Sequence, residues 1–289
     1  MKTRGGFLKK LFIILCICFS TFISCSSASS NTPLENTMEV HYINVGQGDS
    51  ILVRVNNKNM LIDSGPKDNR QNLLNYLNSL DINTIDYLIA THPHEDHIGN
   101  MNAIIKKYTV NKFFSPKVST SSKTFELMIE SLKNKDMKIN ILNTNTNSLD
   151  LGENTKITVL SPLEDENFDN LNNYSAMIKI EYGETSFLFT GDCEKLIENN
   201  VLSRSKNLLK SHVLKLGHHG SSTSSSEEFL CAVNPSLAII TSGKDNSFGH
   251  PHLETLNLLE KHDIHFYNTA YDNTIILISD GNKIFKKND

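Results

Sequence analysis

The chain has 289 residues, enough for one large domain or two ordinary ones, and its proportions of apolar and charged residues are those of a globular protein. Its formal net charge at pH 7 is −4. Lys2, Arg4, Lys9 and Lys10 carry positive charge near the N-terminus, so a chain cleaved beyond them would carry a net charge of about −8. That balance disfavours nonspecific binding to nucleic acid but does not exclude a local basic groove.

Residues 1–24 are typical of a secretory signal, because the basic start is followed by an apolar stretch too short for an ordinary membrane-spanning helix. The sequence Phe22-Ile23-Ser24-Cys25 resembles a bacterial lipobox, with Phe22 where leucine is usual. It predicts that Cys25 is lipidated and anchors the protein to the outer face of the cell membrane. The alternative is ordinary cleavage near Ala28, which would give a freely secreted protein.

Residues 25–37 are polar and lack periodicity, which favours a tether. The globular domain is expected over residues 38–289. Only Cys193 and Cys231 fall inside it, and two thiols do not make a disulfide framework. They could pair only if the fold brings them together, and the favoured prediction is that both are small core residues.

The predicted domain begins with strands. Apolar alternation predicts strands at Met38 to Asn44 and Ser50 to Val55, and a third follows a turn at Asn59 to Asp63. Apolar residues at helical spacing predict a helix over Asn69 to Leu80. The apolar run Ile85 to Ala90 then predicts a buried strand.

Helices and strands alternate through the rest of the chain. Helices are expected at 98–107, 123–133, 194–203, 226–233 and 252–262. Strands are expected at 111–114, 138–142, 156–160, 176–181, 186–190, 212–216, 237–241 and 274–279. The polar stretches 143–154 and 164–173 are expected to be long loops. Two sets of strands with helices between them imply an α/β fold of two packed sheets covered by helices on both outer faces, an αββα four-layer sandwich.

The sequence Thr91-His92-Pro93-His94-Glu95-Asp96-His97 brings three histidines and an aspartate together directly after the buried strand. His92 and His94 are expected to project as one imidazole pair, and Asp96 and His97 toward a second position. Imidazole and carboxylate without thiolate suit zinc, manganese or iron in a hydrolytic site. One loop is therefore predicted to hold two metal ions.

Two later strands end in further candidate ligands. Asp192 follows an apolar strand and Gly191, where its carboxylate could bridge two cations. His218 and His219 end another strand, and at least one of them is predicted to bind metal while the other contacts substrate. The sequence leaves open which does which.

Other residues near these strands are candidates for substrate contact. Ser221 begins a segment that leads into a helix, where a capping box of Ser225 and Glu228 and free amides could hold a phosphate. The alternative is a serine-rich cap without a ligand. His250 is predicted to donate a proton or contact phosphate, with Lys244 as a substrate contact.

One histidine and two aspartates near these motifs have other expected roles. His252 is expected to begin the helix that follows Pro251. Asp63 is expected to serve a structural turn, and Asp49 is left open between structure and function.

The run His92-x-His94-x-Asp96-His97 resembles the first metal motif of the metallo-β-lactamase fold at every defined position. Six motifs together resemble the C-terminal hydrolase domain of ComEC-type competence proteins and their stand-alone relatives, over nearly all of residues 38–289. They are Asn44-Val45-Gly46-Gln47-Gly48-Asp49, the His92 loop, Asn172-Asn173-Tyr174-Ser175, Thr190-Gly191-Asp192, His218-His219-Gly220-Ser221 and Gly249-His250-Pro251-His252.

The chain departs from this pattern in two respects. Asn172 to Ser175 stands where many members of the superfamily carry another histidine ligand, which implies a less fully coordinated first metal. Competence proteins also carry the domain behind a membrane channel of several helices, whereas this sequence shows only a signal, so it is not expected to transport DNA by itself.

The resemblance implies a metal-dependent hydrolase with two divalent ions, zinc or manganese. His92 and His94 would hold one ion, and Asp192 would bridge to a second held by Asp96, His97 and one of His218 or His219. These two ions would activate a water, so that Asp96 also counts as catalytic, and His250 or the spare histidine would protonate the leaving group.

The expected substrate is DNA outside the cell or another phosphodiester. One alternative is a cell-wall phosphoester, a lactone or a β-lactam, and another is a non-catalytic surface binding protein. A basic stripe with Lys179, Lys215 and Lys244 near the site would favour nucleic acid, and a small closed pocket would favour the smaller substrates. The sequence does not indicate an oligomeric state.

Overall fold

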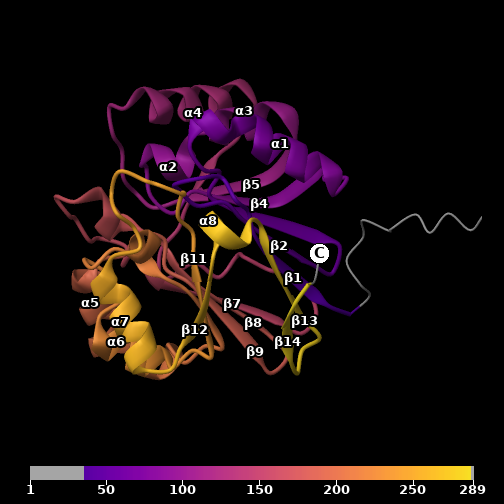
Figure 1. The fold of residues 1–289 in the computed structure, drawn as a ribbon. Helices are drawn as coiled ribbons and strands as arrows, with labels where there is room; N and C mark the ends of the chain where they lie inside the picture. The colour runs from indigo at the N-terminus through magenta and orange to yellow at the C-terminus, as the bar shows by residue number, and fades with distance from the viewer. Residues whose placement is uncertain (1–35, 288–289) are drawn as a thin grey trace, which may run out of the picture. The chain divides into compact units, whose positions relative to one another are not determined.

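The computed structural model describes residues 36–287, so the predicted signal, Cys25 and nearly all of the tether lie outside the described residues. Within that range two β-sheets pack face to face, and helices cover the outer face of each sheet (Figure 1). The predicted α/β class and αββα sandwich are confirmed.

The first sheet, over the described residues, has eight strands in the order β14-β13-β1-β2-β3-β4-β5-β6. Its strands are antiparallel from β14 to β3 and parallel from β3 to β6. The strands are β1 (Met38–Tyr42), β2 (Ile51–Val55), β3 (Lys58–Ile62), β4 (Thr84–Ile89), β5 (Thr109–Ser115), β6 (Ile139–Ile141), β13 (Ile275–Ser279) and β14 (Ile284–Lys286).

The second sheet has six described strands in the order β12-β11-β10-β9-β8-β7. The strands β9 to β12 are parallel, and β7 and β8 extend the sheet in antiparallel fashion. The strands are β7 (Thr155–Ser161), β8 (Met177–Tyr182), β9 (Thr185–Phe189), β10 (Val213–Lys215), β11 (Leu237–Ile240) and β12 (His265–Asn268).

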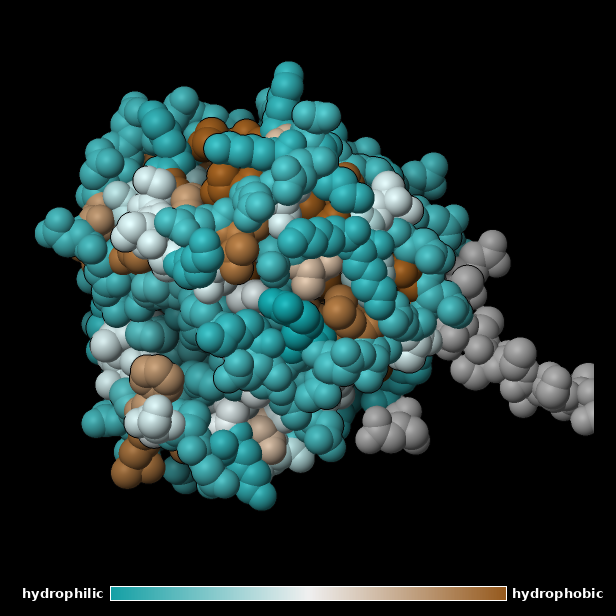
Figure 2. Space-filling model, turned by 90° about the horizontal axis from the view of Figure 1, so that it is seen from above, coloured by the Kyte–Doolittle hydropathy of each residue, from teal (hydrophilic) through white to brown (hydrophobic). Residues whose placement is uncertain are grey.

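Three helices cover each sheet (Figure 1). The first sheet carries α1 (Arg70–Ser79), α3 (Met101–Lys107) and α4 (Lys123–Asn134), and the second carries α5 (Lys195–Ser205), α6 (Glu227–Val233) and α7 (Leu253–Lys261). The short helices are α2 (Glu95–Ile98), α8 (Thr269–Asp272), η1 (Lys67–Asn69), η2 (Leu171–Tyr174), η3 (Lys206–Leu208) and η4 (Gly217–Gly220). The face that carries α1, α3 and α4 is predominantly hydrophilic, with separate small apolar patches (Figure 2).

Apolar side chains fill three layers, one between the sheets and one under each set of helices. Val53 and Phe187, for example, are fully buried between the two sheets. Each square ångström of apolar surface removed from water contributes about 25 cal/mol, so these layers hold the two sheets and their helices together. The parallel strands β4, β9, β10 and β11 end at the carboxyl edges of the two sheets, where open α/β sheets bind ligands.

The structure corrects several predicted elements. The helix expected over residues 98–107 is instead divided between α2 and α3, because Asn100, with φ −112° and ψ 4°, leaves the helical region. Gly99 before it permits a close approach of the Lys67 backbone, since a Cβ there would lie 2.5 Å from the Lys67 nitrogen. The short elements β12, β14 and α8 were not predicted from the sequence. In the described part of the chain, no helix has the length and apolar character needed to cross a bilayer.

The predicted capping box of Ser225 and Glu228 is wrong. The N-cap of α6 is Ser226, whose hydroxyl accepts a hydrogen bond from the Phe229 N–H at 3.4 Å. The N–H groups of Ser225 and Ser226 donate to the buried Glu198 carboxylate on α5. These two amides are therefore not available to a phosphate.

The two cysteines of the domain have different environments. Cys193 is buried and its thiol donates to the Ser175 carbonyl oxygen at 3.3 Å, while burial raises the pKa of the thiol to about 12. It is the core residue that the sequence predicted. Cys231 is exposed, so the same prediction is wrong there.

Candidate metal centre

The loop that follows β4 is held by Asp63, the residue that follows β3. Asp63 accepts hydrogen bonds from the Thr91 N–H at 2.8 Å, from the Thr91 hydroxyl at 2.7 Å and from His97 Nδ1 at 2.7 Å. Its backbone has a positive φ of 60°, a conformation that aspartate tolerates better than most residues. Asp63 thus has the structural role that the sequence favoured, and it also orients a candidate ligand.

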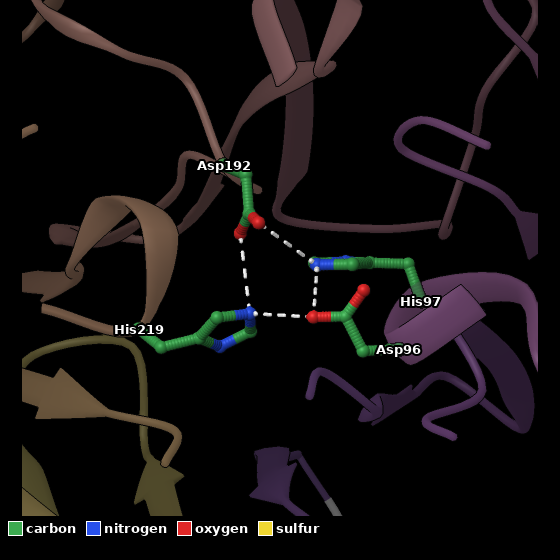
Figure 3. Close-up of side chains that lie close together, drawn as sticks. All are labelled: Asp96, His97, Asp192 and His219. Carbon is green, nitrogen blue, oxygen red and sulfur yellow. Dashed lines mark hydrogen bonds and ion pairs between the residues drawn. The ribbon is translucent and has the colours of Figure 1, made fainter. Parts of the chain in front are cut away.

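Four candidate ligands converge at one point: Asp96 and His97 from the loop and α2 after β4, Asp192 after β9 and His219 after β10 (Figure 3). Their ligand atoms all lie within 4.8 Å of one another. His97 Nε2 lies 3.2 Å from Asp192 Oδ2, and His219 Nε2 lies 3.2 Å from Asp96 Oδ2. Asp96 and His97 follow a strand of the first sheet, and Asp192 and His219 follow strands of the second, so each sheet contributes two of the four ligands.

The hydrogen bonds behind these imidazoles suit metal binding. His97 Nδ1 donates to the Asp63 carboxylate, and His219 Nδ1 donates to the Thr241 carbonyl oxygen at 2.8 Å. Each ring therefore directs Nε2 into the cluster, as metal-bound histidines with a carboxylate or carbonyl behind them do. His97 Nε2 and Asp192 Oδ1 are buried without a hydrogen-bond partner, which a cation between them would resolve.

The electrostatics of the cluster also fit a cation. Burial raises the pKa of Asp192, but His97 and His219 outweigh burial and hold that pKa well below its usual value. Burial lowers the pKa of His219, but Asp192 and Asp49 outweigh it and raise the pKa to about 9. The carboxylates thus stabilise positive charge at the imidazoles. A divalent cation bound at Nε2 would take the place of the proton there.

His92 and His94 lie beside this cluster. His92 Nδ1 lies 3.1 Å from the Ser175 hydroxyl, while His92 Nε2 lies 3.0 Å from His94 Nδ1 and 3.8 Å from Asp192 Oδ2. The structure therefore brings His92 close to the Asp192 carboxylate and places His94 against His92. Among the described residues, however, the cluster whose ligand atoms all lie within 4.8 Å does not include them.

The place of the missing histidine ligand is taken by η2. Asn172 lines the cavity of the site, and its amide oxygen is buried without a hydrogen-bond partner. His218 Nε2 lies 3.8 Å from Asp192 Oδ2, so His218 faces the same carboxylate oxygen as His92. His218 and His219 both have positive φ, of 49° and 54°, a strained conformation that is frequent at functional sites.

An open cavity of about 280 Å³ leads to the cluster. Its lining residues are Gln47, His94, Glu95, Asp96, Asn172, Asp192, His218, His219, Phe248 and His250. Burial and the nearby imidazoles of His218 and His219 lower the pKa of His250 to about 4. His250 is therefore neutral at neutral pH.

Ser221 and Lys244 do not line this cavity. Ser221 is buried, and its hydroxyl accepts from the Thr223 N–H at 3.3 Å, whereas Lys244 is exposed on the loop after β11. Their use in substrate binding stays a prediction. His252 is the N-cap residue of α7, where the sequence placed it.

Two of the three lysines whose basic stripe would favour nucleic acid are buried. Lys215 is fully buried, with Nζ bound to the Asp49 carboxylate and 3.0 Å from the Gly191 carbonyl oxygen. Lys179 is also buried and donates to two backbone carbonyl groups. Asp49, left open by the sequence, thus balances a buried lysine, and its Oδ1 accepts from the Thr241 hydroxyl.

Sequence reasoning did not single out Gln47, Asn172 or Phe248 as parts of the cavity wall. Gln47 and Asn172 lie inside two of the motifs that carry the family resemblance, and that position was the sequence feature that could have indicated them. Phe248 had none, because an isolated aromatic residue in a polar loop has no preferred partner in sequence. Its side chain is 62% exposed beside the site.

Comparison with known proteins agrees with this fold. The family model described as the metallo-beta-lactamase superfamily matches residues 43–243. The chain is 33% identical to ComE operon protein 3 of Bacillus subtilis over 260 residues, covering 84% of this chain and 33% of that protein. It is 30% identical to Recombination protein 2 of Haemophilus influenzae over 278 residues, covering 94% of this chain and 31% of that protein.

The chain thus spans about a third of the length of the curated relatives it matches. Among solved structures, the metallo-beta-lactamase fold protein YhfI of Bacillus subtilis superposes with a TM-score of 0.54 at 12% identity, over 84% of this chain and 99% of that one. At that identity the superposition supports the fold alone, while the family model covers most of the chain. This protein therefore belongs to the metallo-beta-lactamase superfamily.

Proposed function

We propose that this protein is a metal-dependent phosphodiesterase that acts on nucleic acid, with DNA as the main candidate substrate. The observation that carries the hydrolase proposal is the convergence of Asp96, His97, Asp192 and His219 at the end of an open cavity. Both imidazoles direct Nε2 into the cluster, and a fixed carboxylate lies between them. Hydrolytic metal sites combine such ligands with room for a substrate.

The proposed metals are two divalent ions, zinc or manganese. Asp96, His97 and His219 would hold one, His92 and His94 the other, and Asp192 would bridge them. Such ions supply an activated water and neutralise negative charge that develops on a phosphoryl oxygen. The chain itself then has to orient the ester and give a hydrogen bond to its oxygen atoms, and His250 in the cavity wall is the candidate for that role.

The substrate class rests on similarity. The relatives at 30% identity or more include ComE operon protein 3 and Recombination protein 2, and recombination is a process of DNA strands. We also propose that the chain is secreted and held at the outer face of the membrane by a lipid on Cys25.

A small phosphoester of the cell wall is a second candidate substrate, and one observation favours it. Lys179 and Lys215 are buried, so they offer no charge to a nucleic acid backbone, and Glu95 and Asp96 add negative charge to the cavity. A compact ester needs less positive surface than a polyanion does.

The test uses the purified chain loaded separately with zinc and with manganese. Single-stranded DNA, double-stranded DNA and a small phosphodiester are offered as substrates, with the His94→Ala and Asp192→Ala variants as controls. We expect metal-dependent cleavage of DNA that both variants lose. Cleavage of the small ester without cleavage of DNA would move the substrate to the second candidate, and stoichiometric metal without any turnover would overturn the enzyme proposal.

A further inference from the structure

One contact joins two loops of the site that are 203 residues apart in the sequence. Gln47 lies in the loop between β1 and β2, and His250 lies in the loop before α7. The side-chain nitrogen Gln47 Nε2 lies 3.3 Å from His250 Nδ1, and both residues line the cavity.

The direction of this hydrogen bond follows from the other end of the amide. The Gly243 N–H donates to Gln47 Oε1 at 3.0 Å, so Oε1 is the acceptor and the NH₂ group faces the imidazole. An amide NH₂ donates and does not accept, so His250 Nδ1 has to be the acceptor. In a neutral imidazole the ring proton then resides on Nε2.

The N–H group at the other ring nitrogen of His250, Nε2, is free to donate a hydrogen bond. His250 Nε2 has no hydrogen-bond partner within residues 36–287, although the ring lies in the wall of the cavity. The imidazole centroid lies 5.3 Å from that of His218 and 6.2 Å from that of His219, next to the candidate ligands. We propose that Gln47 is a positioning residue that fixes the Nε2–H tautomer of His250, and that this N–H donates to a phosphoryl or leaving oxygen of the substrate.

The surrounding backbone is built to hold this pair. A Cβ on Gly243 would lie 2.8 Å from the Gln47 nitrogen, so only glycine permits the approach that lets its N–H reach Oε1. Asn246 accepts from the His250 N–H at 3.0 Å and donates to the His250 carbonyl oxygen at 2.6 Å. The ring of Phe248 stacks on that of His250 at a centroid distance of 5.6 Å.

His252 provides an internal contrast two residues away. Its Nδ1 accepts from the Ser222 N–H at 2.9 Å, and its Nε2 lies 3.1 Å from the Phe248 carbonyl oxygen and donates to it. Both nitrogens of His252 are therefore satisfied within the chain. His250 shows the same tautomer with its donor left for a ligand, which distinguishes a functional imidazole from a structural one.

The substrate part of this inference rests on the proposed function, but the tautomer does not. The first experiment is therefore ¹⁵N NMR of the histidine rings in the zinc-loaded full chain at neutral pH. We expect the Nε2–H pattern for His250, assigned by its loss in His250→Gln. A proton on Nδ1 of His250 would overturn the inference without any assay of activity.

The second experiment uses Gln47→Glu, which keeps an oxygen for the Gly243 N–H and turns the other atom from a donor into an acceptor. We expect the His250 proton to move to Nδ1, the His252 signals to stay unchanged, and kcat on a phosphodiester to fall about 100-fold, the scale of a lost hydrogen-bond donor to the transition state. Gln47→Met, which neither donates nor accepts a strong hydrogen bond, should show mixed tautomers and a smaller loss.

The outcomes separate the two proposals. A tautomer that switches in Gln47→Glu while kcat stays unchanged would show that the Nε2–H is not used. A wild-type protein with the expected tautomer that hydrolyses no phosphodiester would overturn the proposed function and the substrate role of the donor, and would leave the positioning by Gln47 standing.

Discussion

Asp63 shows how one side chain behind the candidate ligands can control the site. It is fully buried and accepts three hydrogen bonds, one of them from His97 Nδ1. In Asp63→Asn one acceptor oxygen becomes a donor, so His97 loses the partner that directs its Nε2 to the cluster. We expect metal affinity to fall about 10- to 100-fold, the usual effect of losing such a partner, when measured by competition with a chromogenic chelator.

Asp86→Asn is the matched control for this prediction. Asp86 lies on β4 and accepts from the Asn59 N–H at 2.9 Å and from the Asn111 amide at 3.0 Å, away from the candidate ligands. It should leave metal affinity unchanged. Equal affinities for Asp63→Asn and wild type would show that the loop orients His97 without this carboxylate.

His41 gives a prediction about pH that does not involve the metal. It is fully buried on β1, with Nδ1 2.7 Å from the Tyr76 hydroxyl and Nε2 3.2 Å from Glu39 Oε2. Burial lowers the pKa of His41, and the nearby Glu39 does not offset it; Arg54 and Lys287 lower the pKa further. In the unfolded chain the His41 side chain has a pKa of about 6.5, so it binds a proton more tightly there than in the folded chain.

The stability that neutral His41 contributes is thus present above about pH 6.5 and is lost as pH falls through the lowered folded-state pKa. We expect His41→Gln to be less stable than wild type at pH 7.5, with a gap in unfolding free energy that narrows toward pH 5. Urea unfolding at both values measures the gap. A gap that stays constant or widens on acidification would contradict the assignment.

At the scale of elements, hydrophobic periodicity was a sound guide where an element is long or fully buried. Residues 123–133 were expected to be helical and α4 spans Lys123–Asn134, because a long amphipathic helix repeats its apolar stripe several times. The short edge elements β12 and β14 repeat too few residues to give such a signal. The break between α2 and α3 occurs at Asn100, whose φ of −112° lies outside the helical region, and the apolar spacing on either side of it gives no sign of this break.

Gly48 is an element-scale constraint on the metal loop. Its φ of 149° is a conformation that side chains rarely adopt, and a Cβ there would collide with the Asp96 carbonyl oxygen. The next N–H, of Asp49, donates to the same carbonyl oxygen at 3.2 Å. Gly48→Ala should therefore displace Asp96, cost about 1–3 kcal/mol of stability and weaken metal binding.

Gly281→Ala separates the clash from the backbone strain. Gly281 has a φ of 89°, but a Cβ there meets nothing closer than 3.8 Å. This variant should lose stability through strain alone and keep the metal affinity of wild type, measured by the same chelator competition. Weaker metal binding in both variants would mean that global destabilisation, rather than the position of Asp96, controls affinity.

At the scale of the whole molecule, the motifs indicated which candidate ligands lie close together but not which charged residues are buried beneath them. His94, Asp96, Asp192, His218 and His219 line one cavity, and His92 and His97 lie behind it next to Asp192, because each follows a strand at the same edge of its sheet. The burial of Lys215 against Asp49 had no signature, since a lysine next to a ligand motif looks the same in sequence whether it is exposed or buried. Tertiary packing decided the charge of the cavity.

The site also connects the two halves of the fold. His97 follows a strand of the first sheet, and Asp192 and His219 follow strands of the second (Figure 3). A cation bound to all three exists only in the folded chain, so binding adds to folding free energy. It also relieves the repulsion between the close carboxylates of Asp96 and Asp192.

We therefore expect zinc at about 100 times its dissociation constant to stabilise the protein by about 2.7 kcal/mol, and a chelator to reverse the gain. Thermal unfolding with and without chelator measures it. Asp192→Asn should show little response to zinc, because the carboxylate shared by His97 and His219 is lost. If metal binds wild type stoichiometrically but leaves its unfolding temperature unchanged, the unfolded chain binds the ion as tightly as the folded chain does. Metal binding would then not require ligands from both sheets.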